Sequence, residues 1–239
     1  MPDAAVPPDL WVASLGVVGY TEALDLQERV RAARQGGLIP DTLLLLEHPP
    51  VFTKGPRTQS QELPMGEDWY RMQGIEISDT DRGGHLTYHG PGQLVAYPIV
   101  EVRDVPGYVA TLERAMVAAL AEEGVTAVPR DGFPGAWVGD DKIGSIGLHI
   151  SRGVSKHGLA INVDNDLQPF EYVVPCGLDG VRMTSLLRET GRTGAMPCFR
   201  KRVGFQLAKG LGRRQRLVSR DRLERALAGG GAPLASLAG

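Results

Sequence analysis

The chain carries a thiol and an amine that are suited to covalent acyl transfer. Cys176 lies in the run Val174-Pro-Cys-Gly177, and Lys142 lies in the earlier run Gly139-Asp-Asp-Lys-Ile-Gly-Ser-Ile-Gly147. A thiolate attacks thioesters and activated acyl groups, and a nearby ammonium group lowers the pKa of a thiol because it stabilises the charged form. We therefore predict an enzyme that is acylated on Cys176 and uses Lys142 to activate the thiol.

Neither residue is diagnostic when it is taken singly. Free cysteine is among the most buried residue types, and most lysines are solvated, here beside Asp140 and Asp141. The proline and glycine that flank Cys176 favour catalysis, because they predict an irregular turn from which the sulfur is accessible. Cys198 has no such setting, and we expect it in the core or at an incidental surface position.

Two further motifs are rich in glycine and histidine. The first is Arg82-Gly-Gly-His-Leu-Thr-Tyr-His-Gly-Pro-Gly-Gln93, and the second is Lys156-His-Gly-Leu-Ala-Ile-Asn-Val163. The first is typical of a turn between strands, but its glycines would also allow the backbone to approach a ligand, with Tyr88 and His89 in the wall. No Gly-Lys-Ser/Thr closes the motif, which excludes a Walker phosphate loop.

In content and order these motifs resemble the octanoyltransferases of lipoate synthesis, the lipoyl(octanoyl) transferases of the biotin and lipoate protein ligase superfamily. The similarity extends from about Leu43 to about Leu187. One departure is Gly144, where the family commonly has alanine after Lys-Ile. The resemblance implies that Cys176 and Lys142 are catalytic. It also implies a set of substrate-binding residues: Arg82, Gly83, Gly84, His85, Leu86, Thr87, Tyr88, His89, Ser145, Ile146, Gly147, Gly158, Leu159 and Ala160.

The resemblance also implies the reaction. An octanoyl group passes from octanoyl-acyl carrier protein, through a thioester on Cys176, to the ε-amine of a specific lysine on a lipoyl domain. The acceptors would be the lipoyl domains of 2-oxoacid dehydrogenase complexes and the glycine cleavage H protein. Amide formation drives the reaction forward, so we expect no cofactor and no ATP.

Two other functions compete with octanoyl transfer. A ligase that adenylates a free acid would need several phosphate-binding groups, and the glycine-rich loop offers Arg82 alone. A catalytically silent module could bind an acyl or lipoyl group in the same pocket, but the presence of both Cys176 and Lys142 argues against it.

The histidines raise two further questions. His89 or His157 is a candidate for orienting the site or acting as a base. His85 and His89 are four residues apart, as in helical zinc sites, but the residues between them favour a strand. We therefore predict no metal site.

The C-terminal region is dense in basic residues, which predict either a solvated helix face or a dock for an acidic acyl carrier protein. This basic set comprises Arg200, Lys201, Arg202, Lys209, Arg213, Arg214, Arg216, Arg220, Arg222 and Arg225.

Composition is ordinary for a soluble globular protein, with 239 residues, 42% of them hydrophobic and 23% charged. The formal net charge of −2 argues against a nucleic-acid-binding surface. Two cysteines cannot form a disulfide framework, and we find no targeting signal and no run that could span a bilayer, so we expect a cytoplasmic protein. We expect a monomer, with one catalytic domain over residues 1–230 and a flexible tail over residues 231–239.

Hydrophobic periodicity predicts an α+β fold. Helices are expected over Tyr20–Gln35 and Pro106–Glu123, and residues 55–68 are expected to form a loop. Strands are expected at Asp41–His48, Ile75–Ser78, Leu94–Val100, Ala136–Val138, Ile143–Ile150 and Leu159–Val163, and the pattern from Val181 onward is helical. The short, glycine-broken strands indicate an antiparallel or mixed sheet. The resemblance implies a central mixed, largely antiparallel β-sheet flanked by helices.

Overall fold

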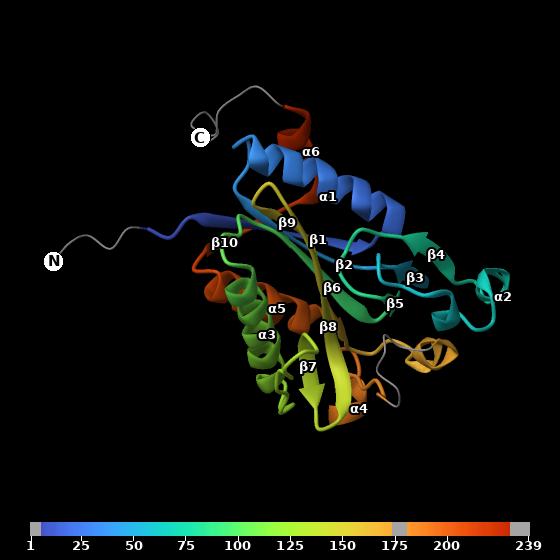
Figure 1. Cartoon of the computed structure of the whole chain (residues 1–239). Helices are drawn as coiled ribbons and strands as arrows, with labels where there is room; N and C mark the ends of the chain where they lie inside the picture. Colours follow the sequence, from blue (N-terminus) through green and yellow to red (C-terminus); the bar gives the residue numbers. More distant parts are fainter. Residues whose placement is uncertain (1–5, 174–180, 230–239) are drawn as a thin grey trace.

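A mixed β-sheet with helices on both faces forms the centre of the molecule (Figure 1). The computed structural model describes residues 6–173 and 181–229, so Cys176 and the predicted tail lie outside the described residues. Seven strands of the described chain form the sheet, in the order β10 (Arg214–Val218), β1 (Asp9–Val17), β2 (Asp41–Glu47), β6 (Gln93–Ile99), β9 (Val154–Asn162), β8 (Asp141–Ser151) and β7 (Gly135–Val138).

Strand β1 pairs in parallel with both β10 and β2. The pairings from β2 through β6, β9 and β8 to β7 are antiparallel. This arrangement confirms the predicted α+β fold with a mixed, largely antiparallel sheet.

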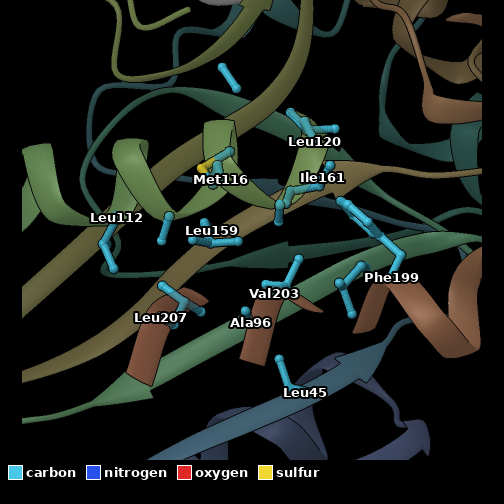
Figure 2. Close-up of a cluster of buried hydrophobic side chains, with 14 of the residues drawn as sticks. Leu45, Ala96, Leu112, Met116, Leu120, Leu159, Ile161, Phe199, Val203 and Leu207 are labelled. Carbon is cyan, nitrogen blue, oxygen red and sulfur yellow. The ribbon is translucent and has the colours of Figure 1, made fainter. Parts of the chain in front are cut away.

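Helices cover the two faces of the sheet in pairs (Figure 1). Helices α1 (Tyr20–Gln35) and α6 (Arg220–Ala228) share one hydrophobic cluster with the sheet, and α3 (Val105–Ala121) and α5 (Met196–Gly210) share the other. Strand β2 is apolar on both sides for this reason: Leu43 and Leu45 belong to the second cluster, while Leu44 and Leu46 belong to the first. Figure 2 shows α3 and α5 packing their side chains against Leu45 and the neighbouring strands.

A smaller sheet lies beside the large one (Figure 1). Its strands are β4 (Glu76–Asp79), β3 (Val51–Lys54) and β5 (Leu86–His89), within the described residues. Side chains from this sheet, from α2 (Glu67–Met72), from the 3-10 helix η2 (Gln168–Tyr172) and from adjoining loops form a third cluster. We call it the aromatic cluster after its four rings, and its members are Phe52, Leu63, Tyr70, Ile75, Leu86, Tyr88, Phe170 and Val173. None of the described helices is long and apolar enough to cross a membrane.

The structure confirms the predicted helix Tyr20–Gln35, and α3 begins one residue before its predicted start. The predicted loop over residues 55–68 was partly wrong, since it contains a 3-10 helix, η1 (Ser60–Glu62), and the start of α2. The helical pattern toward the C-terminus holds for α4 (Leu186–Thr190), α5 and α6 but missed β10. Strand β10 is mostly exposed and is held by backbone pairing at the sheet edge, so its sequence carries little apolar alternation.

Ion pairs within the chain occupy much of the basic set. Arg213 bonds Asp41, Arg214 and Arg216 bond Asp9, and further pairs are Arg200 with Glu47, Arg202 with Glu122 and Arg220 with Glu22. Strand β10 is also five strands from β8, a separation of roughly 24 Å. Both observations favour a solvated face over a carrier dock beside Lys142.

The buried carboxylate of Asp41 predicts unequal effects of two neighbouring arginines. Asp41 is 3% exposed and accepts bonds from Arg34 and Arg213, whereas the pair of Arg214 with Asp9 is largely solvated. We expect Arg213→Ala to lower the free energy of unfolding by about 2–3 kcal/mol, because it leaves a buried charge with one arginine fewer. Arg214→Ala should cost less than about 1 kcal/mol. Urea unfolding followed by circular dichroism measures both, and equal losses would contradict this account.

Candidate active site

A cavity of about 320 Å³ is lined by β8, β9, the chain from Arg82 into β5 and the loop that precedes β7. Every predicted substrate-binding residue except Tyr88 lines it, as does Lys142. The structure therefore brings together three motifs whose cavity-lining residues extend from Arg82 to Ala160 in the sequence. The sequence analysis did not single out Arg57, Tyr97, Gly132, Phe133 and Pro134, which also line the cavity.

Tyr88 lies in the aromatic cluster and not in the cavity wall. Its ring centroid is 5.4 Å from those of both Phe52 and Phe170. Alternation along β5 accounts for this placement, since His89, the next residue, points to the other face and lines the cavity. Tyr88 also lies over Gly90, where a side chain would clash with the phenol ring.

Glycines allow the walls of the cavity to approach one another. Gly147 on β8 is paired with Gly158 on β9. A Cβ atom at Gly158 would clash with the carbonyl oxygen of Ala96, and one at Gly147 would lie 3.1 Å from Cδ of Arg82. The Arg82 segment can therefore cross close over β8, where the Gly83 N–H donates to the carbonyl of Leu148 at 2.8 Å.

The Arg82 guanidinium is buried and directed toward the small sheet. Its Nη2 donates to the carbonyl oxygen and to Oγ1 of Thr53, at 2.6 and 2.8 Å, and its Nε donates to the same hydroxyl at 3.1 Å. Arg82 is 7% exposed. These bonds tie the cavity wall to β3, so the described contacts of Arg82 are structural although the residue lines the cavity.

Lys142 is held through both of its backbone groups. Its N–H donates to the carbonyl of Arg182 at 2.9 Å, and its carbonyl accepts from the N–H of Thr184 at 3.0 Å. Residues 174–180 contain Cys176, and we call them the cysteine segment. The chain that follows this segment is bridged to β8 at Lys142. Asp140 and Asp141, the acidic neighbours in the sequence, pair with Arg130 and Arg182 respectively.

Trp137 places an aromatic ring beside the amine. Nζ of Lys142 lies 5.2 Å from the ring centroid, and the Arg130 guanidinium lies 4.3 Å from it. The indole is buried, and its Nε1–H donates to the carbonyl of Phe133 at 3.1 Å. A ring face stabilises a cation, so Trp137 favours the protonated amine. The sequence Ala136-Trp-Val138 predicted only a strand, and nothing local linked this ring to Lys142.

At Gly144, where the resemblance leads us to expect alanine, a side chain of helix α3 fills the space that a methyl group would need. A Cβ atom at Gly144 would clash with the terminal methyl group of Met116 on α3. Met116 is fully buried in the cluster drawn in Figure 2. The Met116 side chain thus occupies the position of the alanine methyl group, and β8 stays packed near Lys142.

The buried histidines are neutral near pH 7. Burial lowers the pKa of His89 to about 3 and the pKa values of His48 and His157 to about 4. The Nδ1–H of His48 donates to the carbonyl of Val18, and its Nε2 accepts from the Tyr97 hydroxyl at 2.8 Å. His85 and His89 bond different partners, Glu62 and Gln93. No group of three potential metal ligands occurs among the residues that the structure describes.

His157 lies far from Lys142 along the sheet. It is opposite Leu148, six residues beyond Lys142 on β8, which is roughly 20 Å of strand. Its φ of +60° is strained for a residue with a side chain, and its Nε2–H donates to Asp81 at 2.7 Å. This position does not suit a base that shares a proton with Lys142.

These pKa values predict a loss of stability in mild acid. The unfolded chain binds protons on its histidines near pH 6.5, whereas the folded chain resists protonation down to about pH 4, so stability falls as the pH drops through that window. We expect His48→Gln to be less stable than wild type at pH 7. Between about pH 6.5 and pH 4, however, the free energy of unfolding of the variant should fall less steeply than that of wild type, with a difference in slope of up to about 1.4 kcal/mol per pH unit. Urea unfolding at a series of pH values tests this, and an unchanged slope would count against a buried neutral His48.

Comparisons with known proteins place this cavity in a family. The family described as "Lipoyl protein ligase A/B catalytic domain" matches residues 19–208. The chain is 44% identical to "Octanoyltransferase LIP2, mitochondrial" of Arabidopsis thaliana over 77% of this chain and 80% of the relative. It is 45% identical to the octanoyltransferase of Mycolicibacterium smegmatis, over 76% of this chain and 80% of the relative.

Solved structures share the fold at low sequence identity. A lipoate-protein ligase A bound with ATP superposes with a TM-score of 0.70 at 16% identity, over 94% of each chain. The bi-partite lipoate protein ligase of Thermoplasma acidophilum gives 0.72 at 20% identity, over 93% of this chain and 91% of the other. By its motifs, its matched length and its identity to these relatives, the chain belongs to the lipoyl protein ligase A/B catalytic domain family, and within it to the octanoyltransferases, which are acyltransferases.

Proposed function

We propose that this chain transfers an octanoyl group from octanoyl-acyl carrier protein to a specific lysine of a lipoyl domain, through a thioester on Cys176. The observation that carries the proposal is the bridge between Lys142 and the segment from Arg182 to Thr184. It holds the chain that follows the cysteine segment against the cavity wall. The acceptors would be the lipoyl domains of 2-oxoacid dehydrogenase complexes and the glycine cleavage H protein.

The residues that flank the cysteine segment support joint action of Cys176 and Lys142. Val173, before the segment, belongs to the aromatic cluster, and Met183, after it, packs against the same cluster. The described residues on both sides of the cysteine segment therefore contact the aromatic cluster. Met183 is also bridged to β8 through the backbone of Lys142.

The first proposed step is attack of the Cys176 thiolate on the thioester carbonyl. A bond forms between sulfur and the acyl carbon, and the bond to the carrier's thiol breaks. The protonated Lys142 favours the thiolate before attack and can supply the proton that the leaving thiol needs. Trp137 supports this step because its ring stabilises the ammonium form.

In the second step the acceptor lysine attacks the octanoyl-enzyme. An amide bond forms, Cys176 leaves as a thiolate, and the neutral amine of Lys142 takes the proton released by the nucleophile. Each step exchanges one acyl bond for another, so the chemistry needs neither ATP nor a redox partner. Two cysteines cannot form a disulfide framework, which fits a reducing compartment, and we propose the cytoplasm.

The cavity suits an unbranched apolar acyl chain. Leu86, Ile146 and Leu159 supply apolar wall, and the glycines between them keep the space open. An adenylating ligase is the second candidate, since the fold is shared with a ligase that binds ATP. Arg82, the cation that the sequence offered for phosphate, instead directs its described bonds to Thr53.

Intact-protein mass spectrometry tests the covalent step. We expect wild-type protein mixed with octanoyl-acyl carrier protein, without ATP, to gain one octanoyl group. Cys176→Ala should gain none, because it lacks the nucleophile. Lys142→Ala should gain it at least about tenfold more slowly, because its thiol is less ionised. Cys198→Ser is the matched control, since Cys198 is an exposed residue of α5, and it should behave as wild type.

The same experiment separates the competing functions. An adduct that needs free octanoate and ATP would establish the ligase. No adduct under either condition would leave a binding module without acyl-transfer activity. An adduct retained by Cys176→Ala would refute the assignment of the nucleophile.

A further inference from the structure

Buried amide side chains connect the cavity wall to the peptide that is paired with Lys142. Nδ1 of His89 donates to Oε1 of Gln93 at 2.6 Å, Nε2 of Gln93 donates to Oδ1 of Asn162 at 2.9 Å, and Nδ2 of Asn162 donates to the carbonyl of Thr184 at 3.0 Å. None of the four residues is more than 6% exposed. Gln93 and Asn162 are opposite each other in the pairing of β6 with β9.

Backbone carbonyls fix the direction of every bond in this amide network. A carbonyl oxygen can only accept, so the amide nitrogen of Asn162 must face Thr184, and that of Gln93 must face the carbonyl of Tyr88, 3.2 Å away. Oε1 of Gln93 is then directed to His89, whose Nδ1 must carry its proton. The network has one consistent arrangement of donors, so replacing a donor by an acceptor cannot be absorbed by turning an amide.

Thr184 links this network to the backbone of Lys142. Its carbonyl accepts from Asn162 on β9, while its N–H donates to the carbonyl of Lys142 on β8. Asn162 therefore sets the distance between the Arg182–Thr184 segment and the large sheet beside Lys142. A shift of about 1 Å at a reacting group can cost on the order of a hundredfold in rate, so this distance is important for transfer.

We propose that Gln93 and Asn162 are positioning residues of the acyl transfer, which keep Lys142 and the Arg182–Thr184 segment at a fixed place relative to the cavity. The inference rests on the proposed function, because it assumes that Lys142 acts in the transfer. Neither side chain lines the cavity. They act through Thr184 and His89.

Two substitutions of Asn162 test this role. Asn162→Asp keeps the shape of the side chain but replaces its amide nitrogen by an oxygen that faces the Thr184 carbonyl. This oxygen can donate a hydrogen bond only while the carboxyl group is protonated. We expect kcat to fall on the order of tenfold to a hundredfold, with the KM for octanoyl-acyl carrier protein within about twofold of wild type. The loss should grow as the pH rises from about 6 to about 9, relative to wild type. Asn162→Leu removes the donor at every pH, and its loss should not vary in this way.

Ser155→Ala is the matched control for stability. Ser155 is also on β9 and fully buried, and it donates to the carbonyl of Pro98 at 2.7 Å. It is opposite Ile150, eight residues beyond Lys142 on β8, roughly 27 Å away. Its loss should lower the melting temperature and leave kcat unchanged.

The outcomes separate this inference from the proposed function. If both Asn162 variants keep wild-type kcat, or lose no more than Ser155→Ala at equal melting temperature, the amide network has no positioning role. A loss in Asn162→Asp that shrinks as the pH rises would also overturn it, because ionisation removes the donor at that position and should deepen the loss. If wild-type protein itself forms no octanoyl adduct, it is the proposed function that fails.

Discussion

The close approach of the Arg82 segment to β8 is the constraint on which the site depends. Backbone passes close to backbone at Gly83 and Gly147, and both glycines line the cavity. The buried bonds of Arg82 to Thr53 then anchor this wall to the small sheet. A side chain at either glycine would push the two layers apart and change the width of the cavity directly.

Electrostatics divide the cavity into two ends. At one end Lys142 lies beside the ring of Trp137, which favours the ammonium form that would stabilise a thiolate. Toward the other end the rings of Tyr97 and His157 are 6.2 Å apart, and burial keeps His157 uncharged. In the proposed reaction, an apolar acyl chain would meet neutral rings at one end while its carbonyl carbon lay near the cation.

Local sequence predicted the main layers because their signals are local. The 3.6-residue period of Tyr20–Gln35 and the apolar run of β2 each reflect burial of their own residues. These signals failed where contacts with distant residues determine the structure. Tyr88 packs in the aromatic cluster, and β10 forms because it pairs with the edge of β1. The motifs predicted most of the cavity wall through a family resemblance. The roles of Trp137 and Asn162 depend on contacts across strands, which one sequence does not encode locally.

The topology also constrains the order in which the chain can fold during synthesis. The strands from β1 to β9 come from residues 9–162, and β10, the last strand of the described chain, joins the outer side of β1. The strands that carry the cavity walls are therefore synthesised before α5 and β10, and they can begin to pair before those elements are available. Until Arg213 arrives, Asp41 has only Arg34 to neutralise its buried charge. When β10 pairs with β1, Arg213 forms the second ion pair of Asp41. This ion pair stabilises the edge of the finished sheet against fraying.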